Sequence, residues 1–165
     1  MPIEIREYVE SDFESYYEWQ SDPAIAAFVS WLPKRREESK ADLHDAIMQQ
    51  RAAPRVRYFF AVVDSQSNEV VGSVGFTVVE DGVGDCGWFI RRGFWGKGYA
   101  TEAARLMVAA AFGMAGLRHL KASCARGNVA SQRVMEKCGF VCVGQTEARL
   151  RYGHSKADWK RDLRG

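Results

Sequence analysis

The sequence lacks any long hydrophobic run. No stretch approaches the roughly 20 apolar residues that span a bilayer, and the first residues, Met-Pro-Ile-Glu-Ile-Arg, contain no apolar signal core. We therefore expect a cytoplasmic protein with no membrane partner. The 165 residues show neither an internal repeat nor a low-complexity linker. One domain over residues 1–165 is expected, long enough to bury a substantial core.

Cysteine and histidine are scarce. The four cysteines form no C-x-x-C pair and the three histidines are scattered, so the pattern predicts no metal site. Free thiols are the expected state, which suits a reducing compartment. Cys124 has no matched histidine nearby in sequence, and we expect a packed thiol there rather than an acylated nucleophile.

Neither sign of charge dominates the chain. Lysine and arginine number 23 against 21 aspartate and glutamate, a net charge of +2. This balance gives no reason to expect a nucleic acid as the partner. The basic clusters at residues 34–36 and 156–164 have acidic residues within or beside them and are interpreted as solvated faces.

Hydrophobic periodicity predicts an antiparallel meander followed by alternating strands and helices. Strands are expected over residues 3–8, 57–63, 70–79, 86–90, 117–124, 140–143 and 148–152. Helices are expected from Ser11 or Asp12 to Trp19 and over residues 37–50, 102–114 and 128–137, with a structured loop or short helical turn at 22–33. In the second helix Leu43, Ile47 and Met48 should face inward. The pattern predicts a mixed α/β (α+β) domain with helices on both faces of the sheet.

A glycine-containing segment, Phe-Trp-Gly-Lys-Gly-Tyr-Ala-Thr at residues 94–101, is the most informative feature. It leads into the predicted helix 102–114, whose first backbone N–H groups have no intrahelical partner and favour an anion. Gly96 and Gly98 allow close approach of a ligand. An ordinary turn before a helix is the competing interpretation. The segment lacks the glycine spacing and the Lys-Ser/Thr ending of a P-loop.

A second glycine cluster, Gly-Val-Gly-Asp-Cys-Gly at residues 82–87, matches G-x-G-x-x-G. The cluster lies between two predicted strands and opens no helix. The dinucleotide interpretation therefore fails, because that fingerprint requires a strand, a glycine turn and a helix in succession.

Two blocks in register carry a family resemblance. Residues 87–103 read GWFIRRGFWGKGYATEA, and residues 128–140 read NVASQRVMEKCGF. Together they resemble the GNAT superfamily of N-acetyltransferases, and their residues are most similar to those of its RimJ/RimL ribosomal-protein branch. Residues 22–33 also look like the substrate-side loop of that branch. The resemblance covers nearly the whole chain and implies the GNAT-like acyl-CoA N-acyltransferase fold, a mostly antiparallel twisted sheet.

The resemblance also implies a site for acetyl-CoA as co-substrate. The amides of residues 96–101 should hold the coenzyme pyrophosphate, with Lys97 as a nearby charge. The strand 88–90 should pair with the pantetheine arm and offer N–H groups to the thioester oxygen. The implied coenzyme-binding residues are Trp88, Phe89, Ile90, Gly96, Lys97, Gly98, Tyr99, Ala100, Thr101, Asn128 and Ser131.

The chain departs from the family pattern at two positions. Trp95 stands where arginine or glutamine is common, which should matter little because the phosphate contacts are mainly backbone. Met135 stands seven residues after Asn128, where many members carry a tyrosine that protonates the leaving thiolate, and methionine cannot donate a proton. Either Ser131 or a water does this, or the chain is a weakened or non-catalytic relative.

Acidic residues near the coenzyme strand are the candidate general bases. Asp85 is the first choice because it lies two residues before Gly87 on the strand expected to present the thioester, and Glu80 and Glu147 are alternatives. A turn-capping role for Asp85 is equally open. His119 could titrate near neutrality, but we expect a surface or turn histidine there.

These features predict an enzyme that transfers acetyl from acetyl-CoA directly to a primary amine in a ternary complex. The expected acceptor is a protein N-terminus, with a small polyamine or an amine antibiotic as alternatives. Phe28, Val29 and Trp31 should help to form the acceptor pocket. A non-catalytic acyl-CoA-binding module and a nucleotide-phosphate binder are competing hypotheses. A monomer or homodimer is expected.

Overall fold

The structure is a computed structural model that describes residues 2–165. Its centre is a seven-stranded sheet in the order β1-β2-β3-β4-β5-β7-β6. The strands are β1 (Ile3–Glu7), β2 (Arg57–Asp64), β3 (Glu69–Glu80), β4 (Val83–Ile90), β5 (His119–Ala125), β6 (Val141–Gln145) and β7 (Arg149–Ser155). Neighbouring strands pair antiparallel except β4 and β5, which pair in parallel. The predicted mixed sheet, mostly antiparallel, is confirmed.

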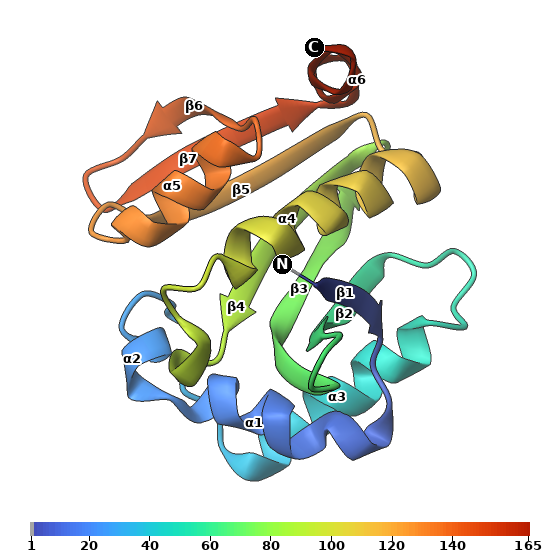
Figure 1. Ribbon diagram of the computed structural model, residues 1–165, viewed down its shortest axis with the longest axis vertical. Helices are drawn as coiled ribbons and strands as arrows, with labels where there is room; N and C mark the ends of the chain where they lie inside the picture. The colour runs from blue at the N-terminus through green and yellow to red at the C-terminus, as the bar shows by residue number, and fades with distance from the viewer. Residues whose placement is uncertain (1) are drawn as a thin grey trace.

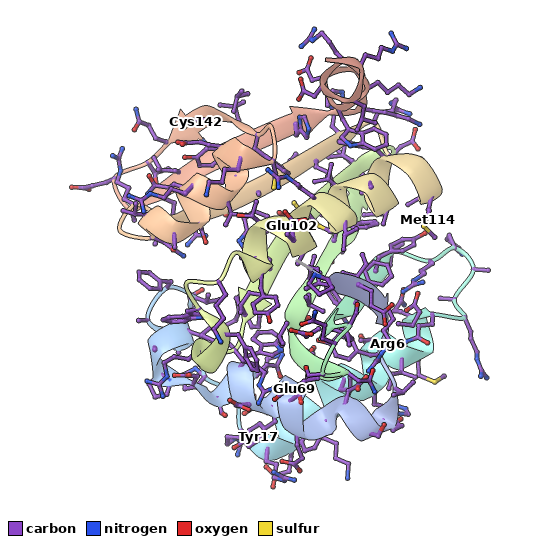
Figure 2. The ribbon with its side chains drawn as sticks, in the orientation of Figure 1. Arg6, Tyr17, Glu69, Glu102, Met114 and Cys142 are labelled. Carbon is purple, nitrogen blue, oxygen red and sulfur yellow. The ribbon has the colours of Figure 1, made fainter. Side chains whose placement is uncertain are left out.

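Helices pack on both faces of this sheet, as Figure 1 shows. They are α1 (Phe13–Ser21), α2 (Pro23–Ala26), α3 (Arg36–Gln49), α4 (Tyr99–Ala109), α5 (Val129–Lys137) and α6 (Lys156–Arg164). A π-helical turn over Ala110–Met114 extends α4. In Figure 2 Met114 marks the end of this extension, and Met114 is exposed.

Two hydrophobic cores lie on opposite faces of the sheet. The larger core joins α4 and α5 to the sheet, and the smaller core joins α1 and α3 to it. Side chains of β4 contribute to both, because successive residues of a strand point to opposite faces. Trp88 and Ile90 pack on the α4 side, whereas Phe89 packs on the α1 side.

Two predictions about helices need correction. Met48 of α3 is 59% exposed rather than inward, while Leu43 is buried. The long helix begins at Tyr99 rather than Glu102, because Gly98 is its N-cap. One helix was not predicted. The segment 156–164 forms α6, which has no buried residue, as its interpretation as a solvated face implies, and Ser155 Oγ caps this helix by accepting from the Asp158 N–H at 3.1 Å.

A buried histidine couples the fold to pH. His154 of β7 lies between Phe112 and Phe140, with ring centroids 5.6 and 5.2 Å away. Among residues 2–165 its Nδ1 finds no hydrogen-bond partner. Burial lowers the pKa of His154, although the nearby carboxylates of Asp162 and Asp158 oppose this shift.

Acidification should therefore destabilise the fold. Between about pH 7 and about pH 5.5 the unfolded chain takes up a proton at this histidine while folded His154 resists it, so the free energy of unfolding falls. Urea unfolding at both pH values should show that acidification lowers the free energy of unfolding less for His154→Gln than for wild type. His119→Gln, at an exposed position, should keep the wild-type fall because His154 is still present. Equal falls in wild type and His154→Gln would contradict this assignment.

Candidate active site

The parallel pairing of β4 and β5 is short, and the two strands separate beyond it. Only Val83–Asp85 of β4 pair with His119–Lys121 of β5. Both strands continue for several residues, and Figure 1 shows them diverging. The sheet therefore opens beside the second half of β4.

The register of β4 decides which backbone groups face this opening. The Arg91 N–H donates to Val71 O at 2.9 Å, so Arg91 turns its backbone groups toward β3. Backbone groups of alternate residues point to opposite sides of a strand. The N–H groups of Trp88 and Ile90 are thus directed toward β5, where β5 has diverged, whereas those of Phe89 face β3. The strand offers two N–H donors to whatever enters the gap.

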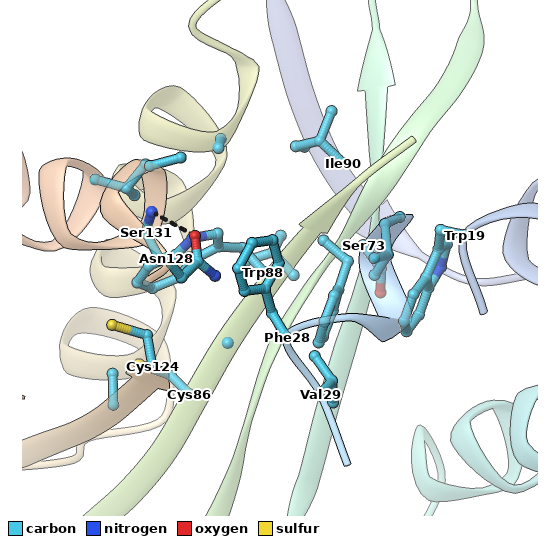
Figure 3. A pocket seen from close by; sticks show the side chains of 18 of the residues that line it. Trp19, Phe28, Val29, Ser73, Cys86, Trp88, Ile90, Cys124, Asn128 and Ser131 are labelled. Atoms are coloured by element: carbon cyan, nitrogen blue, oxygen red, sulfur yellow. Dashed lines mark hydrogen bonds between the residues drawn. The ribbon is translucent and has the colours of Figure 1, made fainter. Parts of the chain in front are cut away.

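A cavity of about 1170 Å³ occupies this opening. It extends from the start of α4 and α5, through the split in the sheet, to α1 and the segment after α2. Figure 3 shows Trp88 between Asn128 and Ser131 on one side and Phe28 and Trp19 on the other. All the sequence-predicted site residues line this cavity except Lys97 and the two alternative bases, Glu80 and Glu147.

The glycine-containing segment forms an open cradle at the start of α4. Gly96 and Gly98 have positive φ values of 76° and 83°, and a Cβ on Gly96 would meet nothing within 4 Å. Gly98 caps α4 without a side-chain hydrogen bond. The first helical bond runs from Glu102 N to Gly98 O at 3.3 Å, so the amides of residues 99–101 have no partner within the helix. Such amides fit an anionic pyrophosphate.

Two side chains anchor this cradle. Trp95 Nε1 donates to Ile90 O at 2.7 Å, which ties the segment to the end of β4. Tyr99 Oη donates to the Asp64 carboxylate at 2.5 Å, which ties the start of α4 to the end of β2. Trp95, a departure from the family pattern, thus has a structural partner that its sequence position did not reveal. Lys97 Nζ lies 5.6 Å from the centre of the Phe94 ring.

Asn128 and Ser131 lie on the opposite wall. Asn128 is the N-cap of α5, and its Oδ1 accepts from the Ser131 N–H at 3.2 Å, the dashed line in Figure 3. Ser131 is half-buried and lines the cavity. Met135 lines it too, but only 2% of the residue is exposed. This leaves Ser131 as the side chain of α5 that lines the cavity and carries a hydroxyl.

Aromatic side chains form the wall on the α1 side. Trp19 stacks on Phe89 with ring centroids 4.4 Å apart, and Trp31 meets Phe89 edge-on at 5.5 Å. The predicted residues Phe28, Val29 and Trp31 line the cavity together. Sequence reasoning missed Trp19 here, because the spacing of α1 shows only that this side chain faces the core.

Asp85 is the one of the three candidate bases that lines the cavity. It lies within β4, opposite Thr77 of β3 and Lys121 of β5, so the turn-capping interpretation is wrong. Partial desolvation raises its pKa, although the charges of Lys121 and Arg149 oppose this shift. Glu80 pairs instead with Lys121 at 3.4 Å.

A second carboxylate in the cavity was not predicted. Asp42 of α3 accepts hydrogen bonds from Tyr16 and from Gln20, and it lies 3.4 Å from Lys34 Nζ and 3.5 Å from Arg57 Nη2. Burial alone would raise its pKa, but these hydrogen bonds and charges outweigh it and hold the pKa below its ordinary value. Asp42 therefore stays ionised, and its negative charge is already balanced by its neighbours.

Two cysteines line the cavity, Cys86 and Cys124. Burial raises the pKa of both, which keeps them as thiols and makes them poor nucleophiles. Cys142 is exposed on β6 (Figure 2). Within residues 2–165 no His, Cys, Asp and Glu side chains gather in a group of three or more that could hold a metal ion. The described helices include none long and apolar enough to cross a membrane.

Comparison with known proteins gives a family and close structural likenesses. Residues 3–141 match the family model described as an acetyltransferase (GNAT) domain. An uncharacterized N-acetyltransferase p20 of Bacillus licheniformis is 24% identical over 144 residues, which cover 86% of this chain and 80% of the relative.

Two solved structures share the fold over almost their whole length. A ribosomal-protein-S5-alanine acetyltransferase from Vibrio fischeri has a TM-score of 0.81 at 19% identity, covering 96% of both chains. A spermidine N-acetyltransferase from Vibrio cholerae, in complex with CoA and spermine, has a TM-score of 0.83 at 16% identity, covering 96% of this chain and 98% of the other. At these identities the likeness establishes the fold.

The cradle can be tested with matched glycine variants. Gly96→Asn keeps a residue that tolerates positive φ but puts a side chain where the pyrophosphate should lie, so its affinity for coenzyme A should fall by about tenfold or more. Gly93→Asn lies outside the cavity, at an open position without positive φ, and should bind as wild type. Isothermal titration calorimetry measures both, and wild-type affinity in Gly96→Asn would refute the cradle.

Proposed function

The chain belongs to the GNAT acetyltransferase family and is an acetyl-CoA-dependent N-acetyltransferase, and from this premise we propose that its acceptor is the α-amine of a protein N-terminus. The observation that carries the proposal is the number of carboxylates on the acceptor side whose charge is not balanced. Asp85 has no ion-pair partner within residues 2–165, whereas the charge of Asp42 is already balanced by its neighbours.

The basicity of the acceptor amine agrees with this acceptor. An α-amine with a pKa near about 8 costs about 1 kcal/mol to deprotonate at pH 7, whereas an alkylamine near about 10.4 costs about 5 kcal/mol. A single carboxylate at the surface of the cavity, such as Asp85, suits the first requirement better than the second. Substrates with several ammonium groups also need several free carboxylates for their charges.

The backbone of β4 would stabilise the charge that develops during transfer. The bound coenzyme supplies an acetyl group activated as a thioester. The N–H groups of Trp88 and Ile90 point into the cleft and can donate to the carbonyl oxygen as it becomes negative. Rigid donors of this kind contribute roughly 3 kcal/mol each.

Asp85 and Ser131 would handle the proton transfers. The Asp85 carboxylate takes the proton of the acceptor ammonium, directly or through a water, and the free amine then forms the N–C bond as the C–S bond breaks. The Ser131 hydroxyl gives a proton to the departing sulfur, a role that Met135 cannot fill. The proton that the acetylated nitrogen then releases returns to the Ser131 oxygen, directly or through a water, and restores the hydroxyl. Acetyl passes straight to the amine, because Cys86 and Cys124 are held as thiols.

An acceptor panel tests the proposal directly. Thiol release from acetyl-CoA is measured with peptides that have free N-termini, with the same peptides blocked at the N-terminus, and with spermidine and an aminoglycoside. Free peptides should give kcat/KM at least about tenfold above every other acceptor, because only they carry a weakly basic amine on an extended chain. Faster acetylation of spermidine or the aminoglycoside would contradict the proposal and favour a small-amine acceptor.

A carboxylate substitution tests the role of Asp85. Asp85→Asn should lower kcat about 100-fold and remove the rise of kcat/KM with pH that follows ionisation of a carboxyl with a raised pKa. Its free energy of unfolding at pH 7 should not fall, because folding partly desolvates this carboxylate. Glu147→Gln, an exposed variant outside the cavity, is the matched control. Full activity in Asp85→Asn would assign the base to another group.

A further inference from the structure

The open floor of the cavity on the acceptor side carries an arginine to which the proposed chemistry assigns no role. Side chains of β4 that share a face with Phe89 include Asp85, with Gly87 between them. A Cβ on Gly87 would meet nothing within 4 Å. Arg149 of β7 lines the same cavity, and its charge acts on the pKa of Asp85. The acidic and the basic side chain thus border one open space.

Arg149 is held in place but not neutralised. Its Nη2 donates to Ser123 Oγ of β5 at 3.0 Å, which fixes the guanidinium on the exposed face of the strands. In the part of the chain that the structure describes, no carboxylate lies within 4.0 Å of it. The other cations that line the cavity, Lys34 and Arg57, both pair with Asp42.

The remaining charges around Arg149 do not cancel it. Lys121, on the neighbouring strand, pairs with Glu80 at 3.4 Å. Arg151 follows on the same face of β7, and Arg126 donates to Gln145 and to the Thr146 carbonyl. An exposed guanidinium with free donors binds carboxylates well, because it can form two parallel hydrogen bonds.

We propose that Arg149 is a specificity-determining residue that binds a carboxylate of the acceptor while Asp85 faces the acceptor amine. This inference rests on the proposed function and narrows it. The substrates are then N-termini that carry an acidic side chain within the first few residues. A lysine at those positions would place a second cation against Arg149 and be disfavoured.

Matched peptides test this specificity. Three peptides of equal length share an N-terminal alanine and carry aspartate, asparagine or lysine at positions two and three. Wild type should favour the aspartate peptide over the lysine peptide by about tenfold or more in kcat/KM. Arg149→Gln should remove the preference, and Arg149→Glu should reverse it. Arg151→Glu makes the same charge change outside the cavity and should keep the wild-type order.

A binding measurement separates this inference from the proposed function. Calorimetry gives the affinity of each peptide for the protein saturated with coenzyme A, and the same order of peptides is expected there. No preference in wild type, or an unchanged preference in Arg149→Glu, overturns the role of Arg149 even when peptides are acetylated.

Free amino acids test whether the carboxylate site can stand when the protein N-terminus is not the acceptor. If free aspartate and glutamate are acetylated and the peptides are not, the protein N-terminus is the wrong acceptor. The carboxylate site then stands only if these amino acids lose at least about tenfold in kcat/KM in Arg149→Glu relative to Arg151→Glu. An equal rate in the two variants overturns it.

Discussion

The site depends on one constraint, the early end of the pairing between β4 and β5. Their ladder stops after Asp85 and Lys121, although each strand continues. A complete sheet would satisfy the N–H groups of Trp88 and Ile90 with β5 carbonyls, and no ligand could reach them. The interrupted ladder leaves these donors for a peptide-like ligand, and we propose that the pantetheine arm binds here much as an added strand would.

Packing must hold β4 and β5 apart, because neighbouring unpaired strands tend to form hydrogen bonds with each other and close the gap. The core on the α4 side fills the space behind β4 with Trp88 and Ile90, and the core on the α1 side holds Phe89 against Trp19. The cradle is fixed to the same strand by Trp95. We propose that these contacts fix the distance between the pyrophosphate site and the thioester site, which is the preorganisation that acyl transfer requires.

Local signals in the sequence were sufficient to predict that the glycine-containing segment leads into a helix, where we place the coenzyme pyrophosphate. Gly96 and Gly98 could be read because a helix N-terminus is defined by residues close together in the chain. The acceptor half is built from distant segments. Asp42, Trp19 and Arg149 reach it from α3, α1 and β7, and no spacing along the chain relates them. Helix α6 was missed because its segment is largely charged, and only Trp159 packs on the core.

Hydrogen exchange of the β4 amides, measured by NMR with and without coenzyme A, tests the central claim most directly. The amides of Gly87 and Phe89 point toward β3 and should be protected in both states. The amides of Trp88 and Ile90 should exchange rapidly in the free protein and become protected when the coenzyme is bound. Protection of Trp88 and Ile90 in the free protein, or no change on binding, would show that the gap between β4 and β5 is not where the acyl arm binds.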